Sequence, residues 1–269
     1  MKRTWIKNAQ IVNEGQTFQG SVVIEDEIIV EILQENETPS NECDETIDAS
    51  GCYLIPGVID DHVHFRDPGL THKADIHTES MAAAAGGVTS YMDMPNTNPQ
   101  TTTLEALEDK FKNAATKSIV NYSFYFGATN GNADLLPQLD KNRVCGVKLF
   151  MGSSTGNMLV DKKNELEKIF KEAERLNMPV DVHCEDSAII SANTKAIKEQ
   201  EGDDPDVKFH PVIRSEEACY QSTASAVELA KKFGTRLNVM HISTAKELEL
   251  LTARKPANKR ITAEVTPAH

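Results

Sequence analysis

Apolar residues alternate with polar ones in short runs through the first part of the chain. Three such runs are separated by turns that hold polar residues or glycine: Trp5–Val12, Ser21–Ile24 and Ile28–Ile32. Short alternating runs bounded by turn residues predict β-strands. Residues 34–50 are polar and contain a proline, which predicts a loop or linker. We therefore predict a small β-domain over residues 1–52.

From about residue 53 the pattern changes to short apolar runs separated by longer segments of helical periodicity. The predicted strands are Leu54–Ile59, Val88–Met92, Val120–Phe126, Gly146–Phe150, Val180–His183, Leu237–His241 and Ile261–Val265. The predicted helices are Asp75–Ala85, Leu104–Ala115, Lys163–Leu176 and Glu216–Phe233. This alternation predicts an α/β fold with a parallel sheet. A (β/α)8 TIM barrel over residues 53–269, with seven of its eight strands, is the preferred fold. An open doubly wound sheet is the alternative, weakened because no GxGxxG motif follows the first strand.

Charge and composition narrow the class of protein. The chain has 269 residues and a formal net charge of −13, which disfavours binding to nucleic acid or to an anionic membrane. No apolar run approaches the ~20 residues that a membrane span needs. The five cysteines form no CxxC pair, so neither a disulfide framework nor a zinc knuckle is predicted. A reducing cytoplasm is the expected location.

The motif Asp60-Asp61-His62-Val63-His64-Phe65-Arg66 follows an apolar strand and is the first sign of chemistry. Residues i and i+2 of a strand point to the same side, so His62 and His64 are predicted to project together as two ligands of one metal ion. Arg66 continues the same series. Two packed or solvated histidines are the alternative interpretation of this motif when it is taken alone.

Further candidates lie at the ends of other predicted strands. His183 ends one strand, His241 ends another, and Lys148 lies within an apolar strand. The carboxyl ends of barrel strands form one face, where catalysis occurs, so these side chains are expected to converge. A plain ammonium group would repel a metal ion. A neutral Lys148 that reacts with carbon dioxide becomes an anionic carbamate, which can bridge two metals.

Other polar residues give weaker signals. The histidines His72, His77 and His210 lie in polar loops or helix starts and are interpreted as surface residues. Glu185, Arg214 and Glu264 lie near strand ends and are candidates for supporting the metal ligands, although no specific pattern assigns them that role.

Two longer blocks resemble a known family. The segment from Pro56 to Gly69 resembles the opening signature of the dihydroorotases, within the amidohydrolase superfamily. The segments from Ala82 to Thr89 and from Met92 to Pro99 resemble the second block of that family. Shorter matches surround Lys148, His183 and His241. The resemblance runs over the whole chain, and the two long blocks are its specific part.

The resemblance implies a site with two zinc ions. His62, His64 and carboxylated Lys148 would hold the first ion, and Lys148, His183 and His241 the second. Arg66 and Asn96 would bind the carboxylate of the substrate. The implied reaction is the reversible hydrolysis of the ring amide of (S)-dihydroorotate to N-carbamoyl-L-aspartate, a step of de novo pyrimidine biosynthesis.

One part of the family pattern falls outside the sequence. The family takes its last metal ligand and its general base from an Asp on the eighth strand, whereas this chain ends at Thr266-Pro267-Ala268-His269. We therefore expect a longer parent protein with that Asp beyond His269, and we expect the 269-residue segment alone to be inactive.

Three alternatives remain at this point. Allantoinases and hydantoinases also open cyclic amides or ureides, and Arg66 together with the Pro95-Asn96-Thr97 block favours dihydroorotase over them. A non-catalytic scaffold is the third, and the retention of all five metal ligands argues against it. The only expected partner is the small-molecule substrate, and a homodimer is the working hypothesis for assembly.

Overall fold

The computed structural model describes residues 1–152, 157–253 and 259–269, and it divides the chain into two compact units. The first unit is Met1–Val58 and the second is Ile59–His269. The division therefore falls a few residues after the boundary expected at residue 52. The reason is a short strand, Tyr53–Leu54, that pairs with the first sheet.

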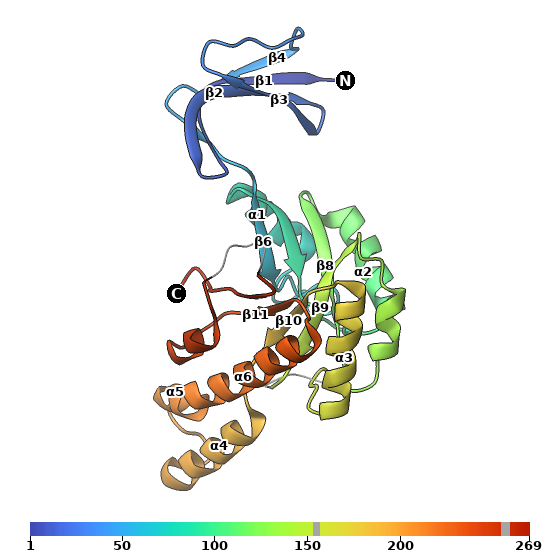
Figure 1. Cartoon of the computed structure of the whole chain (residues 1–269), viewed down its shortest axis with the longest axis vertical. Helices are drawn as coiled ribbons and strands as arrows, with labels where there is room; N and C mark the ends of the chain where they lie inside the picture. Colours follow the sequence, from blue (N-terminus) through green and yellow to red (C-terminus); the bar gives the residue numbers. More distant parts are fainter. Residues whose placement is uncertain (153–156, 254–258) are drawn as a thin grey trace. The chain divides into compact units, whose positions relative to one another are not determined.

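The first unit is a β-sheet with the strand order β3-β2-β1-β4, in which β5 also pairs with β1 (Figure 1). Its strands are β1 (Arg3–Asn13), β2 (Gln16–Glu25), β3 (Ile28–Gln34), β4 (Glu45–Asp48) and β5 (Tyr53–Leu54). The three predicted strands of this unit are confirmed. The prediction of a loop throughout residues 34–50 is wrong, because Glu45–Asp48 pairs with β1 in parallel. Every residue of β4 is exposed, and Ile47 is its one apolar residue, so this strand shows no alternation of apolar and polar positions.

The second unit contains a seven-stranded sheet whose order follows the sequence, β12-β11-β10-β9-β8-β7-β6. The strands are β6 (Val58–Val63), β7 (Val88–Asp93), β8 (Asn121–Gly127), β9 (Val144–Phe150), β10 (Val180–His183), β11 (Leu237–Val239) and β12 (Ile261–Ala263). The pairs from β7 to β12 are parallel. The sheet is curved, as expected for part of a (β/α)8 barrel, and the predicted fold class is confirmed.

The first barrel strand is shifted from its predicted position. Leu54–Ile59 was expected, but β6 begins at Val58 and ends at Val63. The sequence Ile55-Pro56-Gly57 separates β5 from β6, and proline has no N–H to donate to a ladder. As a result His62 lies inside the strand, and His64 comes just after it.

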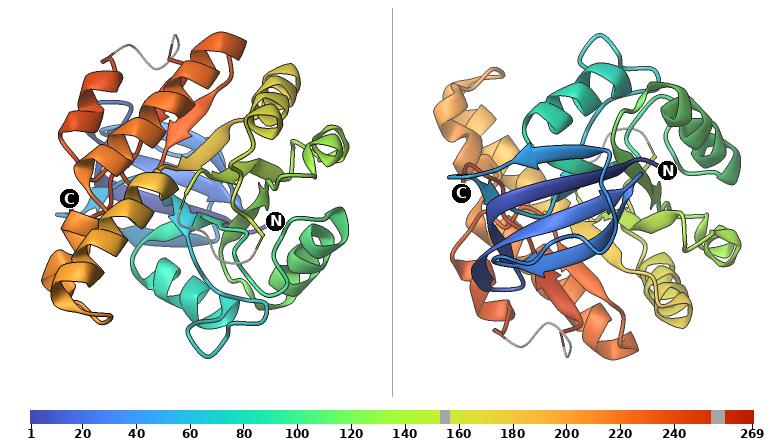
Figure 2. Two further views of the ribbon diagram at one scale, coloured as in Figure 1. Left: turned by 90° about the horizontal axis from the view of Figure 1, so that it is seen from below. Right: turned by 90° about the horizontal axis from the view of Figure 1, so that it is seen from above.

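Helices follow the strands around the outer face of the curved sheet (Figure 2). They are α1 (Ile76–Ala85), α2 (Leu104–Lys117), α3 (Lys163–Leu176), α4 (Ser187–Glu201), α5 (His210–Ile213) and α6 (Glu216–Phe233), with the short 3-10 helices η1 (Ala133–Gln138), η2 (Val207–Phe209) and η3 (Lys246–Leu250). The four predicted helices are confirmed. The sequence reading missed α4 and α5, and α4 buries only Ile197.

The core of the second unit lies between the helices and the sheet. Among its fully buried side chains are Phe124 and Phe126 of β8, Ile169 and Phe170 of α3, and Val180 of β10. A separate small cluster joins Met94, Tyr125 and Met240. In the described ranges, no helix is long and apolar enough to cross a membrane.

Candidate functional site

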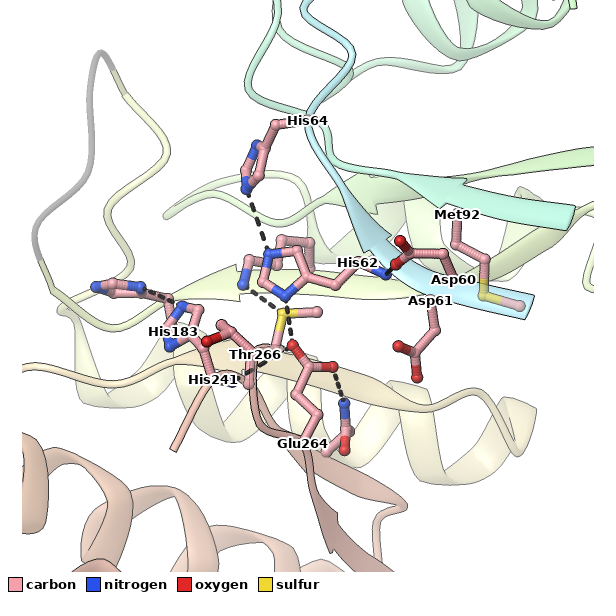
Figure 3. Close-up of polar contacts among 12 residues, drawn as sticks. Asp60, Asp61, His62, His64, Met92, His183, His241, Glu264 and Thr266 are labelled. Atoms are coloured by element: carbon pink, nitrogen blue, oxygen red, sulfur yellow. Dashed lines mark hydrogen bonds and ion pairs between the residues drawn. The ribbon is translucent and has the colours of Figure 1, made fainter. Parts of the chain in front are cut away.

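Two histidines from the end of β6 face each other. His62 Nε2 lies 3.3 Å from His64 Nε2, and Figure 3 shows the two rings meeting at these atoms. The opposite nitrogen of each ring has its own partner. His62 Nδ1 contacts a carboxylate oxygen of Glu264, and His64 Nδ1 lies 2.8 Å from Asn96 Oδ1. Since both partners accept hydrogen bonds, neutral rings carry their protons on Nδ1 and direct two lone pairs at each other.

A second histidine pair comes from the ends of β10 and β11. His183 Nδ1 lies 3.0 Å from His241 Nε2. His183 Nε2 is 2.6 Å from Glu185 Oε2, which assigns the ring proton to Nε2 and leaves Nδ1 as a lone pair. The rings of His62 and His241 have centroids 5.5 Å apart, so the two pairs adjoin.

Burial keeps two of these rings neutral. Burial and the nearby charges of Arg66 and His62 lower the pKa of His64 to about 3. Burial and the neighbouring His183 and Lys148 lower the pKa of His241 to about 4. A neutral imidazole is the form that binds a metal ion, so both rings are in the ligating state at neutral pH.

Lys148 lies on β9 close to both histidine pairs. Its side chain is 1% exposed, and Nζ contacts Met240 Sδ at 2.7 Å. The charge of Lys148 contributes to lowering the pKa of both His64 and His241, one ring of each pair. Burial lowers the pKa of Lys148 itself, while the facing Asp181 opposes this shift. The structure thus favours the neutral amine more than water does.

Three residues that the sequence offered only as candidates for supporting the ligands hold two of the histidines in place. Glu264 contacts His62 and also accepts a hydrogen bond from Asn238 at 3.2 Å. Glu185 contacts His183 and is held in turn by Arg214, whose Nε donates to Glu185 Oε1 at 2.6 Å. Burial of Glu185 is outweighed by the hydrogen bonds from Arg214 and His183, which lower its pKa to about 2. Glu185 is therefore a stable anionic acceptor.

Arg66 and Asn96 both adjoin His64. Asn96 uses its Oδ1 to accept from His64. Arg66 is half-buried, and its charge reaches the His64 ring. However, Arg66 does not continue the strand series as predicted, because β6 ends at Val63 and Arg66 has φ +65°. Its side chain is therefore placed by a local turn rather than by strand alternation.

The amino-acid sequence matches a known protein family. A sequence profile of the amidohydrolase family matches residues 53–248. The chain belongs to the amidohydrolase family.

Individual amidohydrolases match nearly the whole of this chain. A dihydroorotase from Methanosphaera stadtmanae is 33% identical over 249 residues, which are 93% of this chain and 56% of the relative. An L-hydantoinase from Paenarthrobacter aurescens is 31% identical over 268 residues, 98% of this chain and 57% of the relative. The solved structure of an L-hydantoinase (dihydropyrimidinase) from Arthrobacter aurescens superposes with a TM-score of 0.91 at 29% identity, covering 99% of this chain and 59% of that one. The chain thus spans less than two thirds of the length of these amidohydrolases.

The histidine pairs fit the metal ions that the amidohydrolase family implies. Two nitrogens bound to one zinc ion at ~2.0–2.1 Å with tetrahedral angles lie roughly 3.3 Å apart. His62 Nε2 and His64 Nε2 have this separation. Their facing lone pairs repel each other unless a cation lies between them. Within the described part of the chain, no group of three or more His, Cys, Asp or Glu side chains is arranged as a metal site. A zinc ion is usually held by more than two protein ligands, so each histidine pair would need further ligands, and the buried Lys148 is one candidate.

A cavity of about 480 Å³ opens beside the His183–His241 pair. Its walls include Glu185, Arg214 and Thr244. His210 also lines it, although the sequence reading placed this histidine on the surface without a role. His210 is exposed, as predicted, but its sequence context gave no sign that it would lie beside the histidine pair. His72 and His77 are exposed, as expected.

Proposed function

We propose that the protein carrying this chain is a dihydroorotase, which hydrolyses the ring amide of (S)-dihydroorotate reversibly to N-carbamoyl-L-aspartate. The observation that carries the proposal is the pair of facing imidazole nitrogens, His62 Nε2 and His64 Nε2, with Arg66 two residues after His64. Such a pair suits a metal-dependent hydrolase, and an adjacent guanidinium suits a substrate with a carboxylate. The dihydroorotase relatives, 32–33% identical among the first three, support the same activity.

The residues proposed to hold two zinc ions are those at the strand ends. His62, His64 and Lys148 would serve one ion, and Lys148, His183 and His241 the other. When bound, the metal ions would act as Lewis acids on the attacking water and on the ring carbonyl. Glu264, Asn96 and Glu185 would keep the imidazole rings oriented, because each accepts from the ring nitrogen that faces away from the proposed metal position.

Lys148 would serve as a ligand only after carboxylation. Its neutral nitrogen attacks the carbon of carbon dioxide, an N–C bond forms, one C=O electron pair moves to oxygen, and the nitrogen releases a proton to solvent. The product is an anionic carbamate with two oxygens. Burial of Lys148, which favours the neutral amine, supports this step.

Arg66 and Asn96 would bind the substrate carboxylate. The planar guanidinium can donate two parallel hydrogen bonds to a carboxylate. Since Asn96 Oδ1 is engaged by His64, its N–H2 group is the part that can donate to the substrate. This assigns Asn96 two tasks, orienting a ligand and contacting the carboxylate.

Hydantoinase activity is the second candidate, because the L-hydantoinase structure superposes at a TM-score of 0.91. The two activities are separated by a panel of substrates offered to the full-length protein: dihydroorotate, dihydrouracil, hydantoin and allantoin. We expect dihydroorotate to have the highest kcat/KM. Preference for an uncharged ring would instead favour hydantoinase, and no turnover of any of the four substrates by a zinc-loaded protein would favour a scaffold.

The setting proposed for the enzyme is the cytoplasm, within pyrimidine biosynthesis, as a homodimer. All five cysteines are free in the structure, which fits a reducing compartment. Size-exclusion chromatography with light scattering tests the dimer.

A further inference from the structure

The backbone of Arg66 adopts a conformation that its neighbours must maintain. Its φ angle is +65°, in the left-handed region that residues with a Cβ rarely occupy. Such a conformation persists only where the surrounding structure determines it. The residues on either side of Arg66 therefore decide where its guanidinium lies.

The residue before Arg66 is fixed through a buried ion pair. The Phe65 backbone N–H donates to Asp93 Oδ1 at 2.8 Å. Lys110 Nζ lies 2.7 Å from Asp93 Oδ2, and both side chains are fully buried. The same Lys110 Nζ donates to the Met94 carbonyl at 2.8 Å, just before the loop that carries Asn96. One lysine thus ties together the segments that bear both proposed substrate ligands.

The residue after Arg66 is Asp67, and it is held by side chains of α2, the helix that also carries Lys110. Asp67 is 2% exposed and accepts two side-chain hydrogen bonds. Asn113 Nδ2 donates to Asp67 Oδ1 at 2.9 Å, and Lys117 Nζ donates to Oδ2 at 2.7 Å. Lys110, Asn113 and Lys117 are spaced i, i+3 and i+7 on α2, so they share one face of that helix.

We propose that this face of α2 sets the specificity of the site, with Lys110, Asn113 and Lys117 as positioning residues for Arg66. They touch no substrate. By holding Phe65 and Asp67, they keep the Arg66 guanidinium where a substrate carboxylate binds. This inference rests on the proposed function, because it assigns α2 a role only toward a substrate that has a carboxylate.

The test compares two substrates in the full-length protein. Lys117→Met removes the ammonium and keeps the aliphatic stem, whereas Lys117→Arg keeps a cation for Asp67. Lys112→Met is the matched control, since Lys112 is on the same helix and its exposed side chain pairs with Asp109. We expect Lys117→Met to lower kcat/KM for dihydroorotate about 10-fold, mainly through KM, because displaced recognition groups commonly cost one to two orders of magnitude. Dihydrouracil has the ring without the carboxylate, and its slower turnover should change less than about 2-fold. Lys117→Arg should restore most of the dihydroorotate rate.

If kcat/KM falls by the same factor for dihydroorotate and dihydrouracil, the proposal is overturned, because a purely structural role would lower both values together. Asp67→Asn removes the other half of the ion pair, so its effect and that of Lys117→Met should not add. Additive losses would also count against it.

Amide hydrogen exchange gives a readout that does not depend on activity. The amides of residues 64–70 should exchange faster in Lys117→Met than in wild type or Lys112→Met. Unchanged exchange would contradict the claim that α2 holds this segment in place. A wild-type protein that leaves dihydroorotate intact would instead overturn the proposed function and the carboxylate part of this inference, while the exchange result still decides the bracing.

Discussion

The two sides of the histidine site are built differently. On the β6–β7 side, the residues that follow the strands are tied to α2 by fully buried charged groups, Asp93 and Lys110 among them. On the β10–β11 side, His183 and His241 border a cavity of about 480 Å³. There the supporting pair is Glu185 with Arg214, whose side chain is one third exposed.

This difference separates two tasks. A side that recognises a carboxylate needs fixed geometry, because a misplaced bidentate contact loses much of its value. A side bordered by open space can admit the rest of a substrate and allow a product to leave. Substitutions of the groups that hold the segments around Arg66 should therefore change selectivity, and substitution of Glu185, which orients His183, should mainly change metal affinity.

The largest expected effect comes from Lys148, which lies between the two sides. In the full-length protein Lys148→Ala should lose at least one of two metal ions, and activity should fall on the order of 10³-fold or more, since metal activation contributes several kcal/mol. A short-chain carboxylic acid should restore part of the metal binding. Metal analysis by mass spectrometry checks this, and a content that stays at two ions per chain would rule out the bridging role.

The next effect tests carboxylate recognition on the β6–β7 side. Arg66→Lys keeps the positive charge but loses the planar fork, so kcat/KM for dihydroorotate should fall about 10²-fold. Metal content should not change. Unaltered steady-state kinetics would reassign Arg66 to a structural role and remove the main distinction between the two sides.

A smaller effect is expected at Glu185 on the β10–β11 side. Glu185→Gln removes the negative charge that orients His183, and partners of this kind typically contribute 10–100-fold to metal affinity. We expect about 10-fold, because the glutamine oxygen can still accept from His183. Glu217→Gln is the control, since Glu217 is half-exposed on α6 and pairs with Lys246. Competition with a chelator measures the affinity, and equal values for the two variants would contradict the role of Glu185.

Sequence patterns predicted the parts of this fold in which several apolar residues recur at strand or helix spacing. The helix Lys163–Leu176 was placed with both ends correct, because its buried Ile169, Phe170 and Ala173 recur at helical spacing. Strand β4 was missed because Ile47 is its one apolar residue, so only its pairing with β1 reveals it.

From the sequence, the candidate site could be predicted only where its residues lie in short motifs at strand ends. The five proposed ligands lie at or near strand ends, where a barrel brings side chains together. Of the partners that orient them, Glu185 is two residues from His183, whereas Glu264 is 202 residues from His62. The turn at Arg66 was also missed, since a positive φ depends on the buried contacts of Phe65 and Asp67, which no spacing rule contains.

The smallest expected effect concerns the N-terminal caps of two helices. Helix α2 follows β7 in the chain, and α4 follows β10. Thr103 caps α2 by accepting from the Ala106 N–H, and Asp186 caps α4 by accepting from the Ala188 and Ile189 N–H groups. Replacing either cap by alanine should cost its helix about 1 kcal/mol.

Helix α2 buries Leu107, Lys110, Phe111 and Ala114, whereas α4 buries only Ile197. A helix with few buried contacts opens locally, without unfolding the rest of the unit. Thr103→Ala should therefore lower the Tm by about 2–4 °C, the shift typical of a unit of this size. Asp186→Ala should leave the Tm nearly unchanged and speed amide exchange within α4. Equal Tm shifts for the two variants would show that both helices unfold together with the barrel. The difference between the β6–β7 side and the β10–β11 side would then not extend to stability.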